Sequence, residues 1–318
     1  MKAIINICII TIFTVLIGSS CKKQNEPEAI SLQHPAVPTE EYLANLRAYK
    51  KTSHQIAYGW FGGSNGDGKT AAMMNRWETI PDSMDIISCW GGPPQLGSSH
   101  MAAMQHMRKV KGTKVVNCAL VGDFFLTNVD KDFIRKYTRG DDSLLMRGME
   151  LAAKAVSDSI ERYDLDGFDF DYEPTGYLSD PAKFHVFLVA VSKYLGPKSG
   201  TGKLLIVDSY VEHLDSRSIP LIDFYVLQNY SPQGGSVRGI IRRLNSQVPG
   251  MPVERCIIGE NFEALWKNGG LLLDFAKWRP STGIKGGIAT YHMEYEYNSP
   301  VAYQYMRQAI QIMNPAAN

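Results

Sequence analysis

The stretch "YDLDGFDFDYEP", residues 163–174, has the alternating pattern of a β-strand and also carries five acidic side chains between Asp164 and Glu173. Aspartate is depleted in strands, and carboxylates held close together repel one another when they ionise. Acids at positions 169, 171 and 173 alternate with aromatic residues at 168, 170 and 172. Because successive side chains of a strand point to opposite faces, the acids share one face and the aromatics the other.

Seven further apolar runs rich in Val, Ile or aromatic residues predict strands, at 54–63, 84–92, 113–125, 203–210, 223–230, 255–261 and 286–293. Helical spacing of apolar residues occurs between them at 143–163 and 181–195, and closes the chain at 299–313, where Ser299 is the expected N-cap and Pro300 the first helical residue. Eight strands that alternate with helices over about 280 residues are typical of a (β/α)8 TIM barrel in a single domain. An open doubly wound sheet is the alternative, although it usually has fewer strands.

In a barrel the acidic face of strand four points inward, and active sites lie at the carboxyl ends of the strands. This places Glu173 at the mouth, Asp171 beneath it and Asp169 deeper. Carboxyl groups so close cannot all ionise, so some retain protons, and the uppermost can serve as a general acid. A solvated acidic loop would not interleave acids with aromatics so regularly. A Ca²⁺ loop would need more flexible spacing and a Gly at its turn.

The segment "DGFDFDYE", residues 166–173, resembles the complete DxxDxDxE signature of glycoside hydrolase family 18, which contains chitinases and endo-β-N-acetylglucosaminidases. The resemblance covers about residues 50–315. It implies substrate-assisted catalysis, in which Glu173 protonates the glycosidic oxygen and Asp171 orients the substrate's 2-acetamido group and stabilises an oxazolinium-like intermediate. Asp169 matches the buried partner of Asp171. Asp166 matches the first motif aspartate, which implies a structural role, and it is also counted among the predicted substrate-binding residues.

Departures from the chitinase pattern favour the endoglycosidases of N-glycan processing. Strand six ends "LQNY", which resembles their Gln-x-Tyr pattern, so Gln228 and Tyr230 are expected to hold the acetamido group. Strand three lacks the chitinase Ser-x-Gly-Gly and ends with Asp123. Tyr291 occupies the place near which chitinases usually have a floor Trp. About 25 residues separate strands seven and eight, too few for an inserted α+β domain.

Other side chains at strand ends are expected to contact the sugar. The two tryptophans among them are equally compatible with core packing. The predicted substrate-binding residues, besides Asp166, are Trp60, Trp90, Asp123, Asp208, Tyr210, Glu260, Asn261 and Tyr291.

The first 38 residues differ from the rest of the chain. Residues 1–20 contain an apolar run after Met1-Lys2, as in a secretory signal peptide. Cys21 follows directly, as in a bacterial lipoprotein signal, although Gly18 stands where Leu is usual. Residues 21–38 are polar and Pro-containing, which predicts a flexible tether, and residues 39–318 form the predicted barrel. We expect lipid attached at Cys21 to anchor the protein to the cell envelope, at the outer membrane; ordinary secretion is the alternative.

Composition and motifs argue against several other classes of function. The net charge is +1 with no basic run, so nucleic acid is not an expected partner. Residues 63–70 match the GxxxxGK[ST] spacing of a phosphate-binding loop, but a secreted protein meets no ATP pool and no second acidic motif follows. Neither the remaining cysteines nor the histidines have metal-site spacing. We expect no metal, no cofactor and a monomer.

The sequence therefore predicts a secreted, lipid-anchored endo-β-N-acetylglucosaminidase that hydrolyses the GlcNAc-β-1,4-GlcNAc core of N-glycans. One alternative is a chitinase-type hydrolase of chitooligosaccharides. Another is a non-catalytic surface glycan-binding protein on the same fold. The intact acid Glu173 favours the enzymes, since such lectins have commonly lost it.

Overall fold

The structure is a computed structural model that describes residues 38–67, 72–122 and 142–315. Contacts divide the chain into two units, Met1–Thr39 and Glu40–Asn318. Nearly all of the first unit lies outside the described residues, and with it the predicted signal peptide, Cys21 and the tether. The same is true of Asp123. The second unit contains the barrel.

Eight parallel strands form a closed barrel in which each strand pairs with its sequence neighbours and β1 pairs with β8. All eight predicted strands are confirmed, and the open sheet is excluded. The strands are β1 (Ile56–Phe61), β2 (Ile86–Cys89), β3 (Lys114–Leu120), β4 (Gly167–Asp171), β5 (Leu204–Ser209), β6 (Phe224–Gln228), β7 (Cys256–Asn261) and β8 (Gly287–Tyr291).

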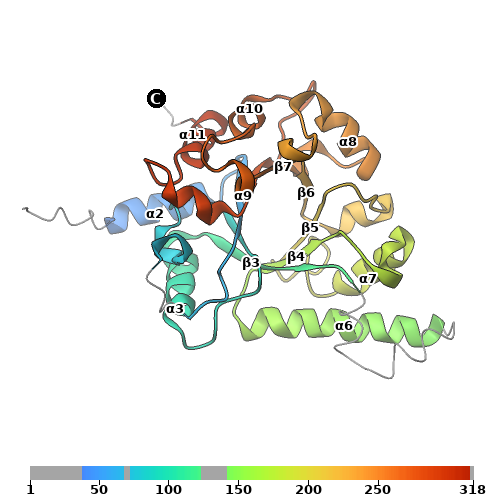
Figure 1. Cartoon of the computed structure of the whole chain (residues 1–318). Helices are drawn as coiled ribbons and strands as arrows, with labels where there is room; N and C mark the ends of the chain where they lie inside the picture. Colours follow the sequence, from blue (N-terminus) through green and yellow to red (C-terminus); the bar gives the residue numbers. More distant parts are fainter. Residues whose placement is uncertain (1–37, 68–71, 123–141, 316–318) are drawn as a thin grey trace, which may run out of the picture. The chain divides into compact units, whose positions relative to one another are not determined.

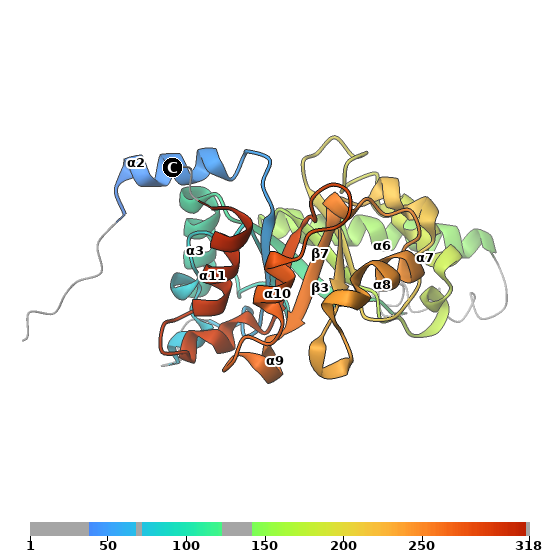
Figure 2. The same ribbon diagram turned by 90° about the horizontal axis from the view of Figure 1, so that it is seen from above.

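Helices surround the strands, as Figure 1 shows. They are α2 (Glu40–Tyr49), α3 (Ser99–His106), α6 (Asp142–Arg162), α7 (Pro181–Val191), α8 (Ile240–Gln247), α9 (Phe262–Leu265), α10 (Leu272–Lys277) and α11 (Gln304–Met313). Short 3₁₀ segments occupy Met73–Asn75, Trp77–Thr79, Gly176–Ser179, Ser216–Leu221, Ser231–Gln233, Val237–Gly239, Val253–Arg255 and Met293–Asn298, and a π-helical turn continues α3 over Met107–Lys111. In Figure 2, α2 and α9 lie at opposite ends of the strands. Of the helices in the described part of the chain, none is long and apolar enough to cross a bilayer.

The predicted helices at 143–163 and 181–195 are confirmed as α6 and α7, but the start predicted for the last helix is wrong. Ser299 and Pro300 do not open it; α11 begins at Gln304. Tyr303, directly before it, has a φ of 57°, which lies in the left-handed region. A residue in this conformation cannot continue a right-handed helix, so the helical path starts only after it.

The alternation along β4 is as predicted and fixes the direction of its acids. Phe168, Phe170 and Tyr172 point outward into the layer between the strands and the helices. The Tyr172 ring stacks on Phe184 of α7, with centroids 4.2 Å apart and planes 8° from parallel. The intervening side chains therefore face the barrel interior. The first position of β4 requires glycine, because a Cβ on Gly167 would lie 2.2 Å from the carbonyl oxygen of Leu204 on β5.

Candidate active site

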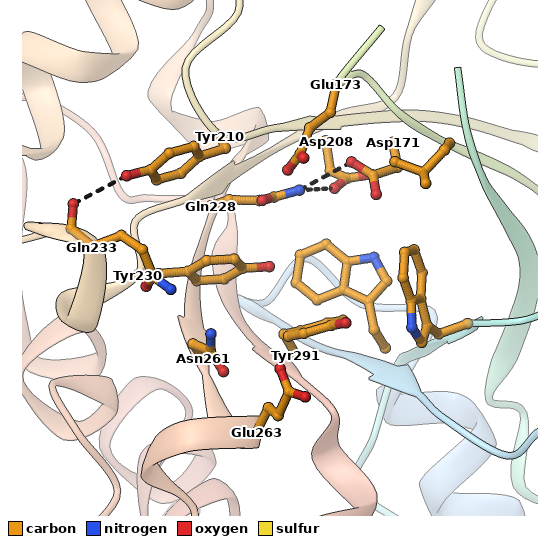
Figure 3. Close-up of a pocket in the computed structure, with 13 residues that line it drawn as sticks. Asp171, Glu173, Asp208, Tyr210, Gln228, Tyr230, Gln233, Asn261, Glu263 and Tyr291 are labelled. Atoms are coloured by element: carbon orange, nitrogen blue, oxygen red, sulfur yellow. Dashed lines mark hydrogen bonds between the residues drawn. The ribbon is translucent and has the colours of Figure 1, made fainter. Parts of the chain in front are cut away.

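A pocket of about 390 Å³ opens at the carboxyl ends of the strands, where the fold predicts a site. Figure 3 shows its lining, with the acidic side chains of β4 and β5 near Gln228 and the tyrosines beside them. Ten of the predicted site residues line the pocket: Trp60, Trp90, Asp171, Glu173, Asp208, Tyr210, Gln228, Tyr230, Asn261 and Tyr291.

Asp169 lies in the barrel interior below the pocket and is fully buried. Its Oδ2 accepts hydrogen bonds from the hydroxyl of Tyr58, from Trp60 Nε1 at 2.9 Å and from Ser88 Oγ at 2.9 Å. Burial raises the pKa of Asp169, and these donors oppose the rise. Tyr58 and Ser88 were not predicted as site residues from the sequence, although both lie on predicted strands. Trp60 is a buried donor whose edge reaches the pocket, rather than an exposed sugar platform.

Asp171 is joined to the next strand through Gln228. The barrel register pairs Asp171 on β4 with Asp208 on β5, so their side chains enter the interior at the same level. Nε2 of Gln228 donates to Asp171 Oδ1 at 3.1 Å and to Asp208 Oδ2 at 2.6 Å. Burial raises the pKa of Asp171 to about 8, and the charges of Glu173 and Asp169 add to the rise. These effects favour a protonated Asp171 at neutral pH.

Glu173 lies two residues beyond the end of β4 and is exposed at the mouth of the pocket. Its backbone N–H donates to the carbonyl oxygen of Asp171 at 3.0 Å, which holds the turn that lifts the side chain over the pocket. Desolvation raises the pKa of Glu173, and the charge of Glu212 adds to the effect. A carboxyl group with a raised pKa at an accessible position suits a general acid.

Aromatic rings form another part of the pocket lining. Tyr230 is nearly buried, and its ring stacks with Tyr291 at 6.0 Å and 27° and with Tyr210 at 6.5 Å and 17°. Burial raises the pKa of Tyr230 well above its usual value, so the hydroxyl remains a donor. Trp90 meets Tyr291 edge-on at 5.5 Å. Together these rings offer flat apolar surfaces beside the acidic cluster, a combination that suits a sugar ring.

Comparison with known proteins agrees with this geometry. The sequence model described as "Glycoside hydrolase family 18, BT1044-like" matches residues 24–312. The chain belongs to glycoside hydrolase family 18. The endo-beta-N-acetylglucosaminidase F2 of Elizabethkingia meningoseptica is 28% identical to it over 324 residues, which cover 91% of this chain and 90% of that protein.

Two solved structures are also similar to this family 18 chain. A selenomethionine form of BT1044 with one glutamate replaced by glutamine is 28% identical, with a TM-score of 0.72, and the match covers 88% of this chain and 94% of the other. An endo-beta-N-acetylglucosaminidase of Cordyceps militaris in complex with fucosyl-N-acetylglucosamine-Asn is 26% identical, with a TM-score of 0.66, covering 88% of this chain and 98% of the other.

Asp166, predicted to belong to the substrate site of this family 18 barrel, lies at its opposite end. It directly precedes β4 and forms a bidentate ion pair with Arg108, in which Nε donates to Oδ2 at 2.7 Å and Nη2 donates to Oδ1 at 2.8 Å. Its carboxylate also accepts from the backbone N–H of Val115 at 2.8 Å. Asp166 therefore fixes the entry of β4 into the barrel and does not contact the pocket.

Glu260 was predicted to contact sugar, and this prediction is wrong. Its carboxylate is fully buried and accepts from three backbone N–H groups, those of Ser231 at 2.9 Å, Asn261 at 2.8 Å and Leu271 at 2.9 Å. Because the Glu260 carboxylate is buried and already accepts these hydrogen bonds, it does not reach the pocket to contact a sugar. Asn261 does line the pocket, while its Oδ1 also caps α9 through the N–H of Ala264.

Three pocket residues were not predicted from the sequence: Leu120 at the end of β3, Gln233 after β6 and Glu263 in α9. The backbone oxygen of Gln233 accepts from the hydroxyl of Tyr210 at 3.1 Å. Glu263 could have been found because it stands just after the strand predicted over 255–261. Leu120 lies within the strand predicted over 113–125, and β3 ends at Leu120, earlier than predicted. Gln233 lies in a loop whose path the sequence did not reveal.

One group in the described part of this family 18 chain has the spacing of a metal site. Sγ of Cys118 and a carboxylate oxygen of each of Asp169 and Asp208 lie within 4.8 Å of one another. Burial, followed by the charges of the nearby carboxylates, raises the pKa of Cys118 well above its usual value, so it remains a thiol. Metals bind the thiolate, and Oδ2 of Asp169 already has three donors. The group therefore does not fit a resident cation.

Proposed function

We propose that this protein is an endo-β-N-acetylglucosaminidase that cleaves between the two GlcNAc residues of the N-glycan core. The observation that carries the proposal is the pairing of Glu173 at the pocket mouth with buried Asp171, which Gln228 holds in place. The similarity to endo-β-N-acetylglucosaminidases over most of the chain supports the same activity.

In the proposed reaction Glu173 gives its proton to the glycosidic oxygen as that bond breaks. The carbonyl oxygen of the substrate's own acetamido group attacks the anomeric carbon from the opposite face, and an oxazolinium ion forms. Asp171 accepts a hydrogen bond from the acetamido N–H and stabilises the positive charge that develops there. In this scheme the Tyr230 hydroxyl orients the acetamido oxygen for the attack.

Water activated by Glu173, now a carboxylate, opens the oxazolinium ion and restores the original anomeric configuration. No carboxylate of the protein acts as a nucleophile in this scheme. The distance between two carboxylates therefore does not indicate the stereochemical outcome, as it would in most other glycosidases.

The related Cordyceps militaris structure supports the N-glycan as substrate. It contains fucosyl-N-acetylglucosamine-Asn, the part of an N-glycan that remains on the asparagine after cleavage within its core. The crystallised form has amides in place of an aspartate and of the glutamate two positions later. Asp171 and Glu173 have the same order and spacing in this chain.

The experiment is mass spectrometry of glycans released from defined glycoproteins by purified residues 39–318. We expect glycans with one GlcNAc at the reducing end and a single GlcNAc left on asparagine. Glu173→Gln should lower kcat by about 10²- to 10⁴-fold, the usual contribution of an acid catalyst. Glu263→Gln, which changes another exposed pocket carboxyl, is the matched control and should lower kcat less than about tenfold.

Cleavage of chitooligosaccharides without release of protein-linked glycans would favour the chitinase alternative. Glycan binding without turnover by the wild-type protein would favour a surface glycan-binding protein. Equal kcat values for wild type and Glu173→Gln would contradict the assignment of the acid.

We also propose, from the sequence alone, that lipid attached at Cys21 anchors this enzyme to the outer membrane. The apolar run that ends immediately before Cys21 and the polar residues that follow support the proposal. Radiolabelled palmitate should be incorporated into the full chain in bacteria, and Cys21→Ala should abolish the label. A labelled Cys21→Ala protein would contradict this site of lipidation.

A further inference from the structure

Asp208 was expected to contact the sugar from a strand end, but although it lines the pocket, its side chain is buried in the barrel interior, level with Asp171 and close to Asp169. Its side chain is fully enclosed, and its Oδ2 accepts from Gln228 Nε2 at 2.6 Å. Oδ1 of Asp208 and Oδ1 of Asp169 are both buried, and within the described residues neither has a hydrogen-bond donor. An oxygen of one carboxyl lies within 4.8 Å of an oxygen of the other.

Two ionised carboxylates in this position would repel each other in a region that water does not reach. A proton on one of them would provide the missing donor, and a hydrogen bond between the two carboxyls would satisfy both orphan oxygens. Asp169 has three donors from Tyr58, Trp60 and Ser88, which stabilise its anion. In the described part of the chain, Asp208 accepts a side-chain hydrogen bond from Gln228 alone, so its ionised form is stabilised less than that of Asp169.

We propose that Asp208 is a neutral carboxylic acid in the working enzyme and that its hydroxyl donates to Asp169. This positioning role rests on the proposed function, because it explains how Asp171 gives its proton to water and becomes an anion as the substrate's acetamido nitrogen becomes positive. The hydrogen bond from Asp208 disperses the charge of Asp169, whose repulsion otherwise opposes the ionisation of Asp171. Asp208 thus supports the reaction through its neighbours without contacting the reacting atoms.

The surroundings of Asp208 favour the neutral form. Burial raises the pKa of Asp208 well above its usual value, and the charges of Asp169 and Asp171 raise it further, against the opposing hydrogen bond from Gln228. Within the described residues, the main groups that act on Asp208 or respond to its charge are acids, tyrosines, a thiol and the amide of Gln228. The titratable ones are Asp169 and Asp171 on β4, Cys118 on β3, Tyr58 on β1, Tyr225 on β6 and Tyr230 after β6.

Two substitutions separate a neutral Asp208 from an ionised one. Asp208→Asn keeps an oxygen to accept from Gln228 and supplies an N–H₂ group to donate to Asp169, as the proposed acid does. Asp208→Ala removes both and leaves buried groups unpaired. We expect Asp208→Asn to lower kcat by less than about tenfold and Asp208→Ala by on the order of 100-fold.

The pH profile distinguishes this role from simple structural support. In Asp208→Ala, Asp169 has lost a hydrogen-bond donor that stabilised its anion. The pKa at which the interacting pair Asp169 and Asp171 loses its last proton should therefore rise. The acidic limb of kcat against pH should therefore move to higher pH in Asp208→Ala and stay near its wild-type position in Asp208→Asn. Equal loss of kcat in both variants, or an identical shift of the limb in both, would overturn the proposal.

An infrared difference spectrum tests the protonation state without turnover. At neutral pH, wild type minus Asp208→Asn should contain a carboxylic-acid C=O band; a lost carboxylate band in its place would overturn the proposal. Stoichiometric metal in the purified protein would also overturn it, since a cation would replace the proton. If the wild-type protein releases no glycans, the proposed function is wrong. The infrared spectrum would still show whether Asp208 is protonated, because it does not depend on turnover.

Discussion

The side-chain amide of Gln228 connects the acids of two strands, and we expect Gln228→Glu to disable the site without changing its shape. Nε2 donates to Asp171 at 3.1 Å and to Asp208 at 2.6 Å. The introduced carboxyl must hold a proton to donate at all, and its one hydroxyl can serve one of these two acceptors. At least one of the two hydrogen bonds is therefore lost, and a further acid joins the cluster.

The size of the effect follows from that lost bond. A hydrogen bond to a charged group, which Asp171 becomes in the proposed transition state, contributes about 1.5–3 kcal/mol. Since about 1.4 kcal/mol corresponds to a factor of ten in rate, kcat should fall about 10- to 150-fold. The added acid also raises the pKa of Asp171, so the acidic limb of the kcat profile should move to higher pH. The assay is glycan release from a glycopeptide between about pH 4 and about pH 9.

Gln55→Glu is the matched control, because Gln55 is another buried glutamine with two side-chain hydrogen bonds. It lies at the amino end of the barrel, where Nε2 donates to the carbonyl oxygen of Met313 and Oε1 accepts from Lys285. We expect it to lower stability without moving the pH profile. A folded Gln228→Glu enzyme with wild-type kcat and an unshifted acidic limb would refute the reasoning, as would the same kinetic defect in Gln55→Glu.

Two further outcomes are expected. Tyr230→Phe should lower kcat more than it raises KM, because its hydroxyl acts mainly in the cyclising transition state; an effect confined to KM would make Tyr230 an ordinary binding residue. Asp171→Asn should alter the pH dependence of stability. With a pKa of about 8 in the folded state, Asp171 binds more protons there than in the unfolded chain between about pH 4 and about pH 8. The wild-type free energy of unfolding should therefore fall as pH rises through this window, by a few kcal/mol at most, and urea titrations should find a flatter dependence in Asp171→Asn. Parallel curves for the two proteins would contradict the raised pKa.

The sequence predicted the barrel because its strand signals are local and strong. Alternation in residues 166–173 was enough to predict which side chains face the interior, and Phe168 and Phe170 do pack under the helices. The same alternation identified Asp171 and Glu173 as pocket residues. These inferences succeeded because they depend only on the alternation of side chains along one strand, which can be read from neighbouring residues.

The errors concern partners that come from distant parts of the chain. Asp166 looks like its acidic neighbours in sequence, but its position before the strand brings it to Arg108 at the other end of the barrel. Glu260 does stand at a strand end, as an active-site residue would, and the backbone N–H groups that occupy it lie on separate loops. No local pattern could reveal that Trp60 donates to Asp169, because 109 residues separate them.

Glu260 also limits how the rim of this pocket can be redesigned or can diverge. One carboxylate holds the backbone of the loop after β6 at Ser231, the end of β7 at Asn261 and the approach to α10 at Leu271. These segments are therefore not interchangeable modules. A loop transplanted from a relative to change glycan preference should carry its neighbour with it. We expect libraries that vary residues 231–235 and 262–271 together to yield more folded, selective enzymes than libraries that vary either loop alone.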